Sequence, residues 1–289
     1  MPLPHFFIVG VPKAGTTALY NYLSQHPQIY LPPCKEPHYF SYSGESLPCW
    51  GIKTTSAYEK LFQTAVAHQI IGEASTWYLY STTAANQIYQ KLPRSKIIVL
   101  LRQPVERAYS SWAFRVQCGW EPIQDFEKAI EVETARIQSR CEWDFHYLSA
   151  GFYYPQLKRY FDHFPREQIR VYLQEDFKQD PIAVIRDVLD FLSVDGSYIT
   201  DFSMNYNVTQ LPKSRLVNQF LTKQNLTKSF LKAFIPNSLR CQLSAQLRTF
   251  NQTKVPPLSV ELRRKLTTQY QEDIHKTEAL TGCDLSSWQ

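Results

Sequence analysis

The stretch GVPKAGTT, residues 10–17, most constrains the fold because it sets two glycines and one lysine directly behind an apolar run. That run, residues 6–9, is short and partly aromatic, which predicts a buried strand ending at Gly10. The apolar residues beyond Thr17 fall on one face of a predicted helix that closes at Pro27. A strand, a glycine loop and a helix in this order form the backbone context that a phosphate-binding loop requires.

The position of its lysine distinguishes this loop from the loop that binds nucleoside triphosphates. The Walker pattern has lysine after the second glycine, but here Thr16 follows Gly15, and Lys13 stands two residues before that glycine. The loop N–H groups and the hydroxyls of Thr16 and Thr17 are suitable donors to phosphate. The arrangement favours group transfer from a single 5′-phosphate without a metal over a triphosphate with Mg²⁺. The alternative is a tight turn with a solvated lysine.

Short apolar runs recur along the chain, and helical patterns lie between them. Residues 70–71, 96–101 and 169–173 predict buried strands, whereas residues 84–91 and 154–161 predict helices. This alternation indicates a three-layer α/β fold of the P-loop type, with a central parallel sheet flanked by helices. Ligands of such sheets bind at the carboxyl ends of the strands.

One further helix has its own start signal. Asp180 followed by Pro181 is the pattern of an N-cap residue with proline in the first helical position. Apolar residues at helical spacing come next, and they predict a face that packs on the sheet. The residues expected on that face are Ile182, Ile185, Leu189 and Leu192.

The length of the chain fits one domain over residues 1–289. Residues 112–150 are rich in charged and aromatic residues, and they predict a helical cap over the site. Residues 200–257 are polar and weakly periodic, so we expect loops there that close over cofactor and substrate. A last amphipathic helix is expected over residues 258–280.

Charge and composition narrow the range of partners. The formal net charge is +5, and no run of lysine or arginine stands out, so a nucleic-acid partner is not expected. No window reaches about 18 apolar residues and no signal-peptide pattern is visible, so we expect a cytoplasmic protein without a membrane span. The six cysteines and the histidines lack metal-ligand spacing, so no metal site is expected.

A second phosphate-binding feature follows residues 96–101, in the sequence RQPVERAYSSW. Arg102 stands at the carboxyl end of that predicted strand, where a planar bidentate donor can bind a phosphate. Pro104 is suited to open the next helix, whose N-terminus faces the same anion. Ser110 lies two turns further along this helix. The alternative is a surface arginine beside an ordinary helical serine.

The sequence PKAGTTALYNYL resembles the 5′-phosphosulfate-binding loop of the sulfotransferases, enzymes that use 3′-phosphoadenosine 5′-phosphosulfate (PAPS). The resemblance implies that the loop contacts this cofactor through Lys13, Ala14, Gly15, Thr16 and Thr17. It also implies that Arg102 and Ser110 hold the 3′-phosphate, which would exclude ATP.

Three stretches bear on the branch of the family. Ala18 follows the two threonines, as in the carbohydrate (heparan sulfate) branch, whereas enzymes acting on small alcohols and phenols have tryptophan there. In the stretch GEASTWY, Ala74 stands where the carbohydrate branch has a lysine after the glutamate. This difference argues against a heparan-type acceptor. LPKSRL lacks the glycine of that branch's K-G-R loop and is more similar to bacterial members. It implies contacts from Lys213 and Arg215 to the 3′-phosphate or adenine, with a solvated basic turn as the alternative.

CKEPHYF, residues 34–40, is similar to the E-x-H-F-F stretch of the heparan 3-O-sulfotransferases, which supplies a catalytic carboxylate and a nearby histidine. The resemblance implies that Glu36 is the general base for the acceptor hydroxyl and that His38 orients it or binds substrate. His38 is a second candidate for the base, and Glu36 is favoured. The alternative is a surface pair of Lys35 and Glu36 with His38 packed on aromatic side chains.

Together these features predict a sulfotransferase that moves a sulfuryl group from PAPS to a hydroxyl, with a carbohydrate as the first choice of acceptor. Lys13 is expected to stabilise charge on the departing phosphate oxygen of the product, 3′,5′-ADP. A lipid, a small natural product or a tyrosine is an alternative acceptor. A nucleotide kinase or other NTPase, and a catalytically silent nucleotide-binding protein, are alternatives of other classes. A sugar-binding cleft is one interpretation of the aromatic residues Trp112, Trp120, Trp143, Tyr147 and Tyr153, and a place in the core is the favoured alternative.

Overall fold

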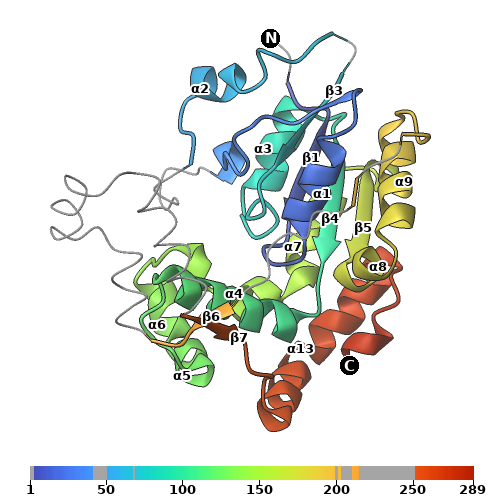
Figure 1. The fold of residues 1–289 in the computed structure, drawn as a ribbon. Coiled ribbons are helices and arrows are strands. Elements are labelled where there is room, and N and C mark those ends of the chain that lie inside the picture. Colours follow the sequence, from blue (N-terminus) through green and yellow to red (C-terminus); the bar gives the residue numbers. More distant parts are fainter. Residues whose placement is uncertain (1–2, 42–50, 68, 199–200, 203–209, 215–250) are drawn as a thin grey trace, which may run out of the picture.

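The computed structural model of the chain describes residues 3–41, 51–67, 69–198, 201–202, 210–214 and 251–289 (Figure 1). Within these ranges a five-stranded sheet forms the centre, and helices pack on both of its faces. The predicted three-layer α/β fold is therefore confirmed. Among the described helices, none combines the length and the apolar character needed to cross a membrane.

The central sheet is parallel throughout. Its strands lie in the order β2-β3-β1-β4-β5. Every residue of β1 and nearly every residue of β4 is buried, because helices cover both faces of the sheet and leave no polar side to the strands. The parallel direction brings the carboxyl ends of all the strands to one edge. The strands are β1 (Phe6–Gly10), β2 (Ile29–Tyr30), β3 (Ile70–Ala74), β4 (Lys96–Leu101) and β5 (Ile169–Leu173).

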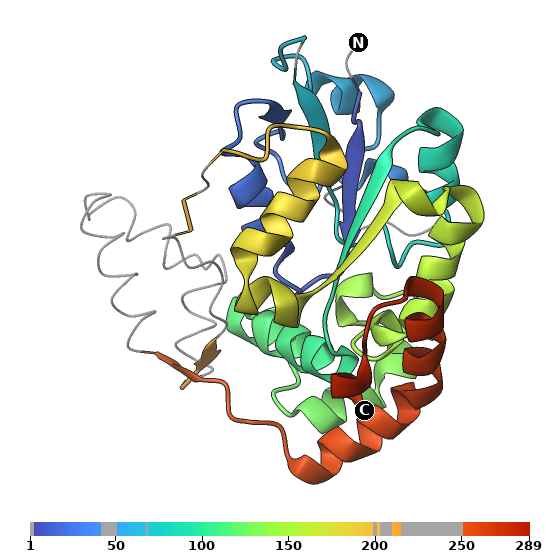
Figure 2. The same cartoon turned by 90° about the vertical axis from the view of Figure 1, so that its right-hand side faces the viewer.

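Two groups of helices form the outer layers (Figures 1 and 2). The first group packs on one face and comprises α1 (Thr16–Leu23), α8 (Gln174–Gln179) and α9 (Pro181–Leu192). The second group packs on the other face and comprises α3 (Ala84–Lys91), α7 (Tyr153–His163) and α13 (Val260–Thr281). Helix α13 lies along α7 and also contacts α4.

Helix α9 begins as its sequence predicts, although one residue of its expected apolar face is wrong. The Asp180 carboxylate accepts a hydrogen bond from the N–H of Ala183 (2.9 Å), and Pro181 takes the first helical position. Ile182 is 47% exposed rather than buried. Ile182 lies in the first turn of the helix, at the edge of the buried face that is centred on Ile185 and Val188. The sheet therefore does not cover its side chain.

The remaining described α-helices and strands follow β4 in the sequence, apart from one helix that precedes β3. Helix α4 (Pro104–Cys118) follows β4, and α5 (Phe126–Glu131) and α6 (Glu133–Gln138) follow α4, so the stretch predicted as a helical cap does contain helices. Its role as a cap remains a prediction. A small antiparallel pair, β6 (Gln210–Pro212) and β7 (Gln252–Lys254), packs on α4. Helix α2 (Thr55–Lys60) lies before β3.

The contact between β1 and β3 allows a test of the packing. Gly72 pairs with Phe6, and a Cβ atom added at Gly72 would lie 2.1 Å from the Phe6 ring. Because Phe6 is fully buried and its ring cannot move freely, Gly72→Ala should lower the free energy of unfolding by about 1–3 kcal/mol. Denaturant unfolding measures this change. Gly51→Ala is the control, since its Cβ would meet no atom closer than 3.6 Å, and an equal loss in both variants would contradict the prediction.

Candidate active site

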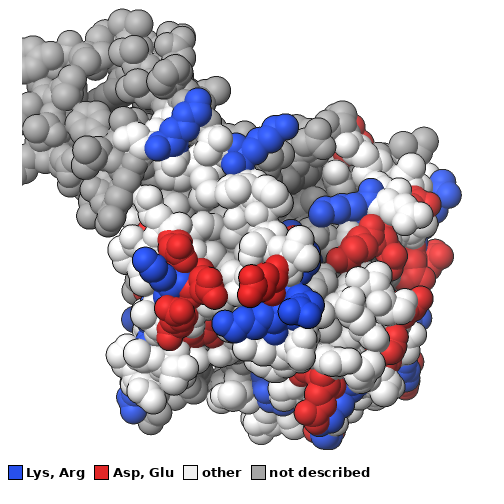
Figure 3. All heavy atoms as spheres, turned by 90° about the horizontal axis from the view of Figure 1, so that it is seen from below, with Lys and Arg blue, Asp and Glu red and all other residues white. Residues whose placement is uncertain are grey.

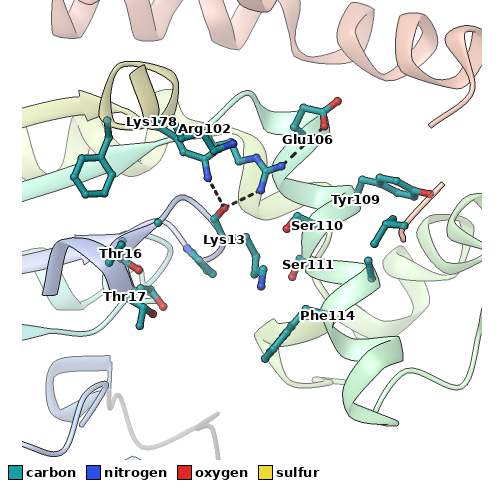
Figure 4. A pocket seen from close by; sticks show the side chains of 18 of the residues that line it. Lys13, Thr16, Thr17, Arg102, Glu106, Tyr109, Ser110, Ser111, Phe114 and Lys178 are labelled. Atoms are coloured by element: carbon teal, nitrogen blue, oxygen red, sulfur yellow. Dashed lines mark hydrogen bonds and ion pairs between the residues drawn. The ribbon is translucent and has the colours of Figure 1, made fainter. Parts of the chain in front are cut away.

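The carboxyl edge of the sheet opens into a pocket of about 1040 Å³ (Figure 4). Loops that follow β1, β3, β4 and β5 each contribute lining residues, because parallel strands bring their carboxyl ends together. The structure brings seven of the predicted site residues to this one pocket. They are Lys13, Gly15, Thr16, Thr17, Glu36, Arg102 and Ser110.

The loop between β1 and α1 has a left-handed turn at two residues. Lys13 has φ 72° and Gly15 has φ 98°, and only glycine adopts the second conformation without strain. Gly15 is the N-cap of α1 and offers no side chain to the first helical N–H groups. A helix N-terminus of this kind carries partial positive charge and binds anions. The loop therefore has the geometry of a phosphate site.

Lys13 points across the pocket toward α4 (Figure 4). Its Nζ atom lies 4.0 Å from the centre of the Phe114 ring, a cation–π contact. Burial, together with the positive charges of Arg102 and Arg115, lowers the pKa of Lys13 to about 8. An anion bound beside these three side chains would relieve their repulsion, so the pocket is suited to a negatively charged ligand.

Arg102 holds the loop from the neighbouring strand end. Its Nη1 atom donates to the backbone carbonyl of Lys13 (2.9 Å), and its Nη2 atom lies 4.0 Å from the carboxylate of Glu106. Ser110 lines the pocket one turn beyond Glu106 on α4, so the two predicted phosphate contacts share one wall of the pocket. Gln103 caps this helix by accepting a hydrogen bond from the Glu106 N–H (2.8 Å).

Glu36 and His38 occupy a loop with strained backbone. Both have positive φ, 63° and 51°, and the Glu36 N–H donates to the carbonyl of Ala74 (2.8 Å). The Glu36 carboxylate lines the pocket, and it contacts the His38 Nε2 atom (3.2 Å) and the Lys35 ammonium. Burial acts to raise the pKa of Glu36, but the hydrogen bond from His38 and the charge of Lys35 outweigh it and lower the pKa to about 2.

His38 lies behind Glu36 rather than in the pocket. Its side chain is fully buried, it packs against the Tyr78 ring, and it is not among the described residues that line the pocket. The sequence left Glu36 and His38 as two candidates for the same task. The structure separates them by position, because only Glu36 reaches the space that a substrate can enter.

A buried carboxyl group supports this loop from below. Glu73 on β3 is fully buried, and it accepts hydrogen bonds from the hydroxyls of Ser75 (2.6 Å), Tyr58 (2.7 Å) and Tyr78 (2.9 Å). Two of these hydroxyls in turn accept loop N–H groups: Ser75 accepts that of His38 and Tyr78 that of Phe40. Burial raises the pKa of Glu73 to about 7, although the three hydroxyl donors oppose the shift.

Three predicted cofactor contacts are not among the pocket-lining residues. Ala14 is fully buried beneath the loop, so any contact from it would come through its backbone. Lys213 follows β6, has an exposed side chain, and donates its backbone N–H to the carbonyl of Asn251 (2.6 Å). Arg215 lies outside the described residues.

Several lining residues were missed by the sequence analysis. Glu106 and Phe114 stand four residues before and after Ser110, so the helical repeat of α4 could have indicated both. Lys178 and Arg263 belong to distant helices, and no local pattern marks them. Further lining residues of this kind are Trp77, Tyr109, Arg115 and Phe202.

Of the five aromatic residues that could form a cleft, three belong to the core, the favoured alternative. Trp112, Tyr147 and Tyr153 are buried and belong to the core, whereas Trp120 is 58% exposed and Trp143 is half-buried. Instead, Trp77 lines the pocket, and its indole N–H donates to Asp144 (3.0 Å). In the part of the chain that the structure describes, no group of three or more histidine, cysteine and acidic side chains is placed to hold a metal ion.

Comparison with known proteins bears on these observations. The family model described as "Sulfotransferase domain" matches residues 3–235. A crystal structure of a sulfotransferase from Alicyclobacillus acidocaldarius superposes with a TM-score of 0.78 and is 31% identical, covering 100% of this chain and 99% of that one.

Two curated proteins show how much of a longer relative the chain matches. Membrane-associated sulfotransferase kil1 of Dictyostelium discoideum is 26% identical over 75% of this chain. Heparan sulfate glucosamine 3-O-sulfotransferase 3B1 of Mus musculus is 30% identical over 72% of this chain. The matched part spans 63% of the Dictyostelium protein and 50% of the mouse protein, so both relatives are longer than the region they share with this chain.

The raised pKa of Glu73 predicts a pH dependence of stability. In the folded protein the carboxyl group keeps its proton up to about pH 7. In the unfolded chain its pKa has the ordinary value of 4.5, so it loses the proton at a lower pH. The unfolded state therefore releases the proton first, and stability should fall as pH rises from 4.5 through 7. Glu73→Gln removes this titration, so the stability of the wild type relative to this variant should decline by about 1.4 kcal/mol per pH unit in that window.

Denaturant unfolding at pH 5, 6, 7 and 8 measures this difference. Glu131→Gln changes an exposed carboxylate and is the matched control. A difference between wild type and Glu73→Gln that stays constant across the four pH values would contradict the prediction.

Proposed function

The chain belongs to the sulfotransferase domain family, and from that premise we propose that it transfers a sulfuryl group from PAPS to a hydroxyl group, releasing 3′,5′-ADP. One observation carries the proposal: the phosphate-type loop with Lys13, the strand-end Arg102 and the Glu36 carboxylate line the same pocket. An anion site with an ionised carboxylate beside it suits transfer of a group from a phosphate to a hydroxyl.

The loop after β1 and the residues after β4 would each hold a different phosphate of the proposed cofactor. The N-terminus of α1, Thr16, Thr17 and Lys13 would hold the 5′-phosphosulfate, whereas Arg102 and Ser110 would hold the 3′-phosphate. In the transfer a bond forms between the acceptor oxygen and sulfur, and the bond between sulfur and the 5′-phosphate oxygen breaks. Lys13 would stabilise the negative charge that develops on that departing oxygen. This arrangement needs no metal ion in the step.

Glu36 is the proposed base that takes the proton of the acceptor hydroxyl. The low pKa keeps its carboxylate ionised at neutral pH, and its position in the pocket gives it access to the acceptor. A bound anionic cofactor would raise this pKa and so strengthen the base. His38, which lies behind Glu36 and contacts its carboxylate, is better placed to orient that group than to meet substrate.

A carbohydrate is the acceptor that we favour. Relatives with similar sequences are described as heparan sulfate and carbohydrate sulfotransferases. Two aromatic side chains that line the pocket, Trp77 and Phe114, offer apolar surface that a sugar ring can contact. Arg115, which also lines the pocket, pairs with Asp144. A lipid, a small natural product or a tyrosine remains an alternative acceptor for the same chemistry.

Ligand-dependent stabilisation distinguishes this proposal from a nucleotide kinase. A ligand at about 100 times its Kd adds about 2.7 kcal/mol to the free energy of unfolding. We expect a rise in melting temperature with 3′,5′-ADP and little change with ATP and Mg²⁺. A rise in melting temperature with ATP and Mg²⁺ but not with 3′,5′-ADP would support a kinase or NTPase and refute the proposal.

Replacing Lys13 tests the transfer step. Lys13→Ala removes the cation nearest the proposed leaving oxygen, and it should reduce turnover by roughly 10²- to 10³-fold or more while leaving the protein folded. Steady-state sulfation of a panel of hydroxyl acceptors, with PAPS as donor, measures this. Lys60→Ala, an exposed lysine on α2, is the control, and unchanged turnover in Lys13→Ala would refute the assignment.

Replacing Glu36 tests the identity of the base. Glu36→Gln should lower kcat by roughly 10²- to 10⁴-fold, because general base catalysis contributes about that much. It should leave 3′,5′-ADP binding within a few-fold of the wild type. His38→Asn should lower kcat less, since its effect acts through Glu36. If kcat fell by that factor in His38→Asn while Glu36→Gln kept near-normal turnover, the base would be His38.

A further inference from the structure

The end of the pocket near Arg102 contains a second arginine from a distant part of the chain. Arg263 lies in the first turn of α13 and lines the same pocket as Arg102 and Ser110. Its guanidinium pairs with one carboxylate oxygen of Glu106, and the other oxygen lies 4.0 Å from the Arg102 Nη2 atom. Glu106 therefore stands between a sequence neighbour, Arg102, and an arginine from a distant part of the chain, Arg263.

We propose that Arg263 is a second arginine for the 3′-phosphate and that it contributes to the choice between nucleotides with and without that group. This inference rests on the proposed function, since it assigns a further residue to the same cofactor. The 3′-phosphate would take up the guanidinium groups that now face Glu106.

The charge at this end of the pocket supports the assignment. One Nη atom of Arg102 is already committed to the Lys13 carbonyl, so Arg102 cannot offer its whole guanidinium to a phosphate. A phosphate bears about two negative charges, and arginine is the residue that binds it in a bidentate manner. Arg263 supplies the further donors, and with a side chain that is 43% exposed it can turn toward a ligand.

The backbone around Arg263 is held against α4. The Tyr109 hydroxyl donates to the carbonyl of Pro256 (2.9 Å), and residues 255–258 line the pocket just before α13 begins. The Ser259 side chain caps α13 by accepting the N–H of Leu262 (3.2 Å), and Leu262 is buried. These contacts fix the first turn of α13, so that Arg263 stays at the pocket even though its own side chain is partly exposed.

The face of the protein around this end has no single sign of charge. On the face seen from below, lysine and arginine side chains lie beside aspartate and glutamate side chains (Figure 3). Selective attraction of a 3′-phosphate therefore requires particular basic side chains at the pocket rather than a broad positive surface. Arg102 and Arg263, which flank Glu106 there, meet this requirement.

Two nucleotides that differ only in the 3′-phosphate test the proposal. Calorimetric titration of the full chain with 3′,5′-ADP and with 5′-AMP gives Kd for each. Arg263→Ala should weaken 3′,5′-ADP binding about tenfold, which is about 1.4 kcal/mol, and leave 5′-AMP binding within twofold. Arg264→Ala, which removes the exposed arginine next along α13, should leave both Kd values unchanged. An Arg263→Ala variant that still prefers 3′,5′-ADP as strongly as the wild type does would overturn the proposal.

Glu106→Gln separates phosphate binding from a purely structural ion pair. If Arg263 served only to pin α13 to α4 through Glu106, this variant would weaken 3′,5′-ADP binding as Arg263→Ala does, and that result would also overturn the proposal. If Arg263 contacts the phosphate, loss of the competing carboxylate should keep binding equal or make it tighter. A wild-type protein that binds 3′,5′-ADP no better than 5′-AMP would instead refute the proposed function itself.

Discussion

The hydrogen bond from Arg102 to the backbone carbonyl of Lys13 is the contact on which the rest of the site depends. It ties the loop after the central strand to the end of the neighbouring strand. The side-chain amide of Gln174, the first residue of α8 and the residue directly after β5, donates to the same carbonyl (3.4 Å). With that carbonyl held, Lys13 keeps its left-handed backbone and extends its side chain toward Phe114. The carbonyl oxygen of Lys13 thus links the residues that follow β1, β4 and β5. Holding it in place also directs the Lys13 ammonium group into the pocket.

The opposite wall of the pocket depends on a buried carboxyl group. Glu36 and His38 hold strained backbone conformations, and such conformations persist only where the surroundings over-determine them. The determining contacts come from β3, through the carbonyl of Ala74 and the hydroxyl of Ser75, and Glu73 orients that hydroxyl. A group that never meets substrate therefore supports the position of the proposed base.

Local patterns predicted much of the fold and part of the site. The run at β4 is continuous and apolar because helices cover both faces of the sheet there. The run at β5, on the edge of the sheet, is interrupted by the exposed Arg170, but its apolar and aromatic residues still marked a strand, and the bounds of both strands matched the prediction. The two-residue strand β2 was missed because so short an element has no periodicity, and Ile182 was misplaced because helical spacing alone does not show where the sheet ends. Glu106 and Phe114 could have been inferred from the repeat of α4, whereas Arg263 could not.

The sequence by itself determined the phosphate-type loop, the alternation of strands and helices, and the residue types at Glu36 and Arg102. These follow from short-range rules of backbone geometry, periodicity and side-chain chemistry. Only the tertiary structure decided that Glu36 faces the pocket while His38 lies behind it, and that Arg263 meets Glu106. Burial and charge pairing between segments so far apart in the sequence arise from the packing of whole helices on the sheet, which no local pattern encodes.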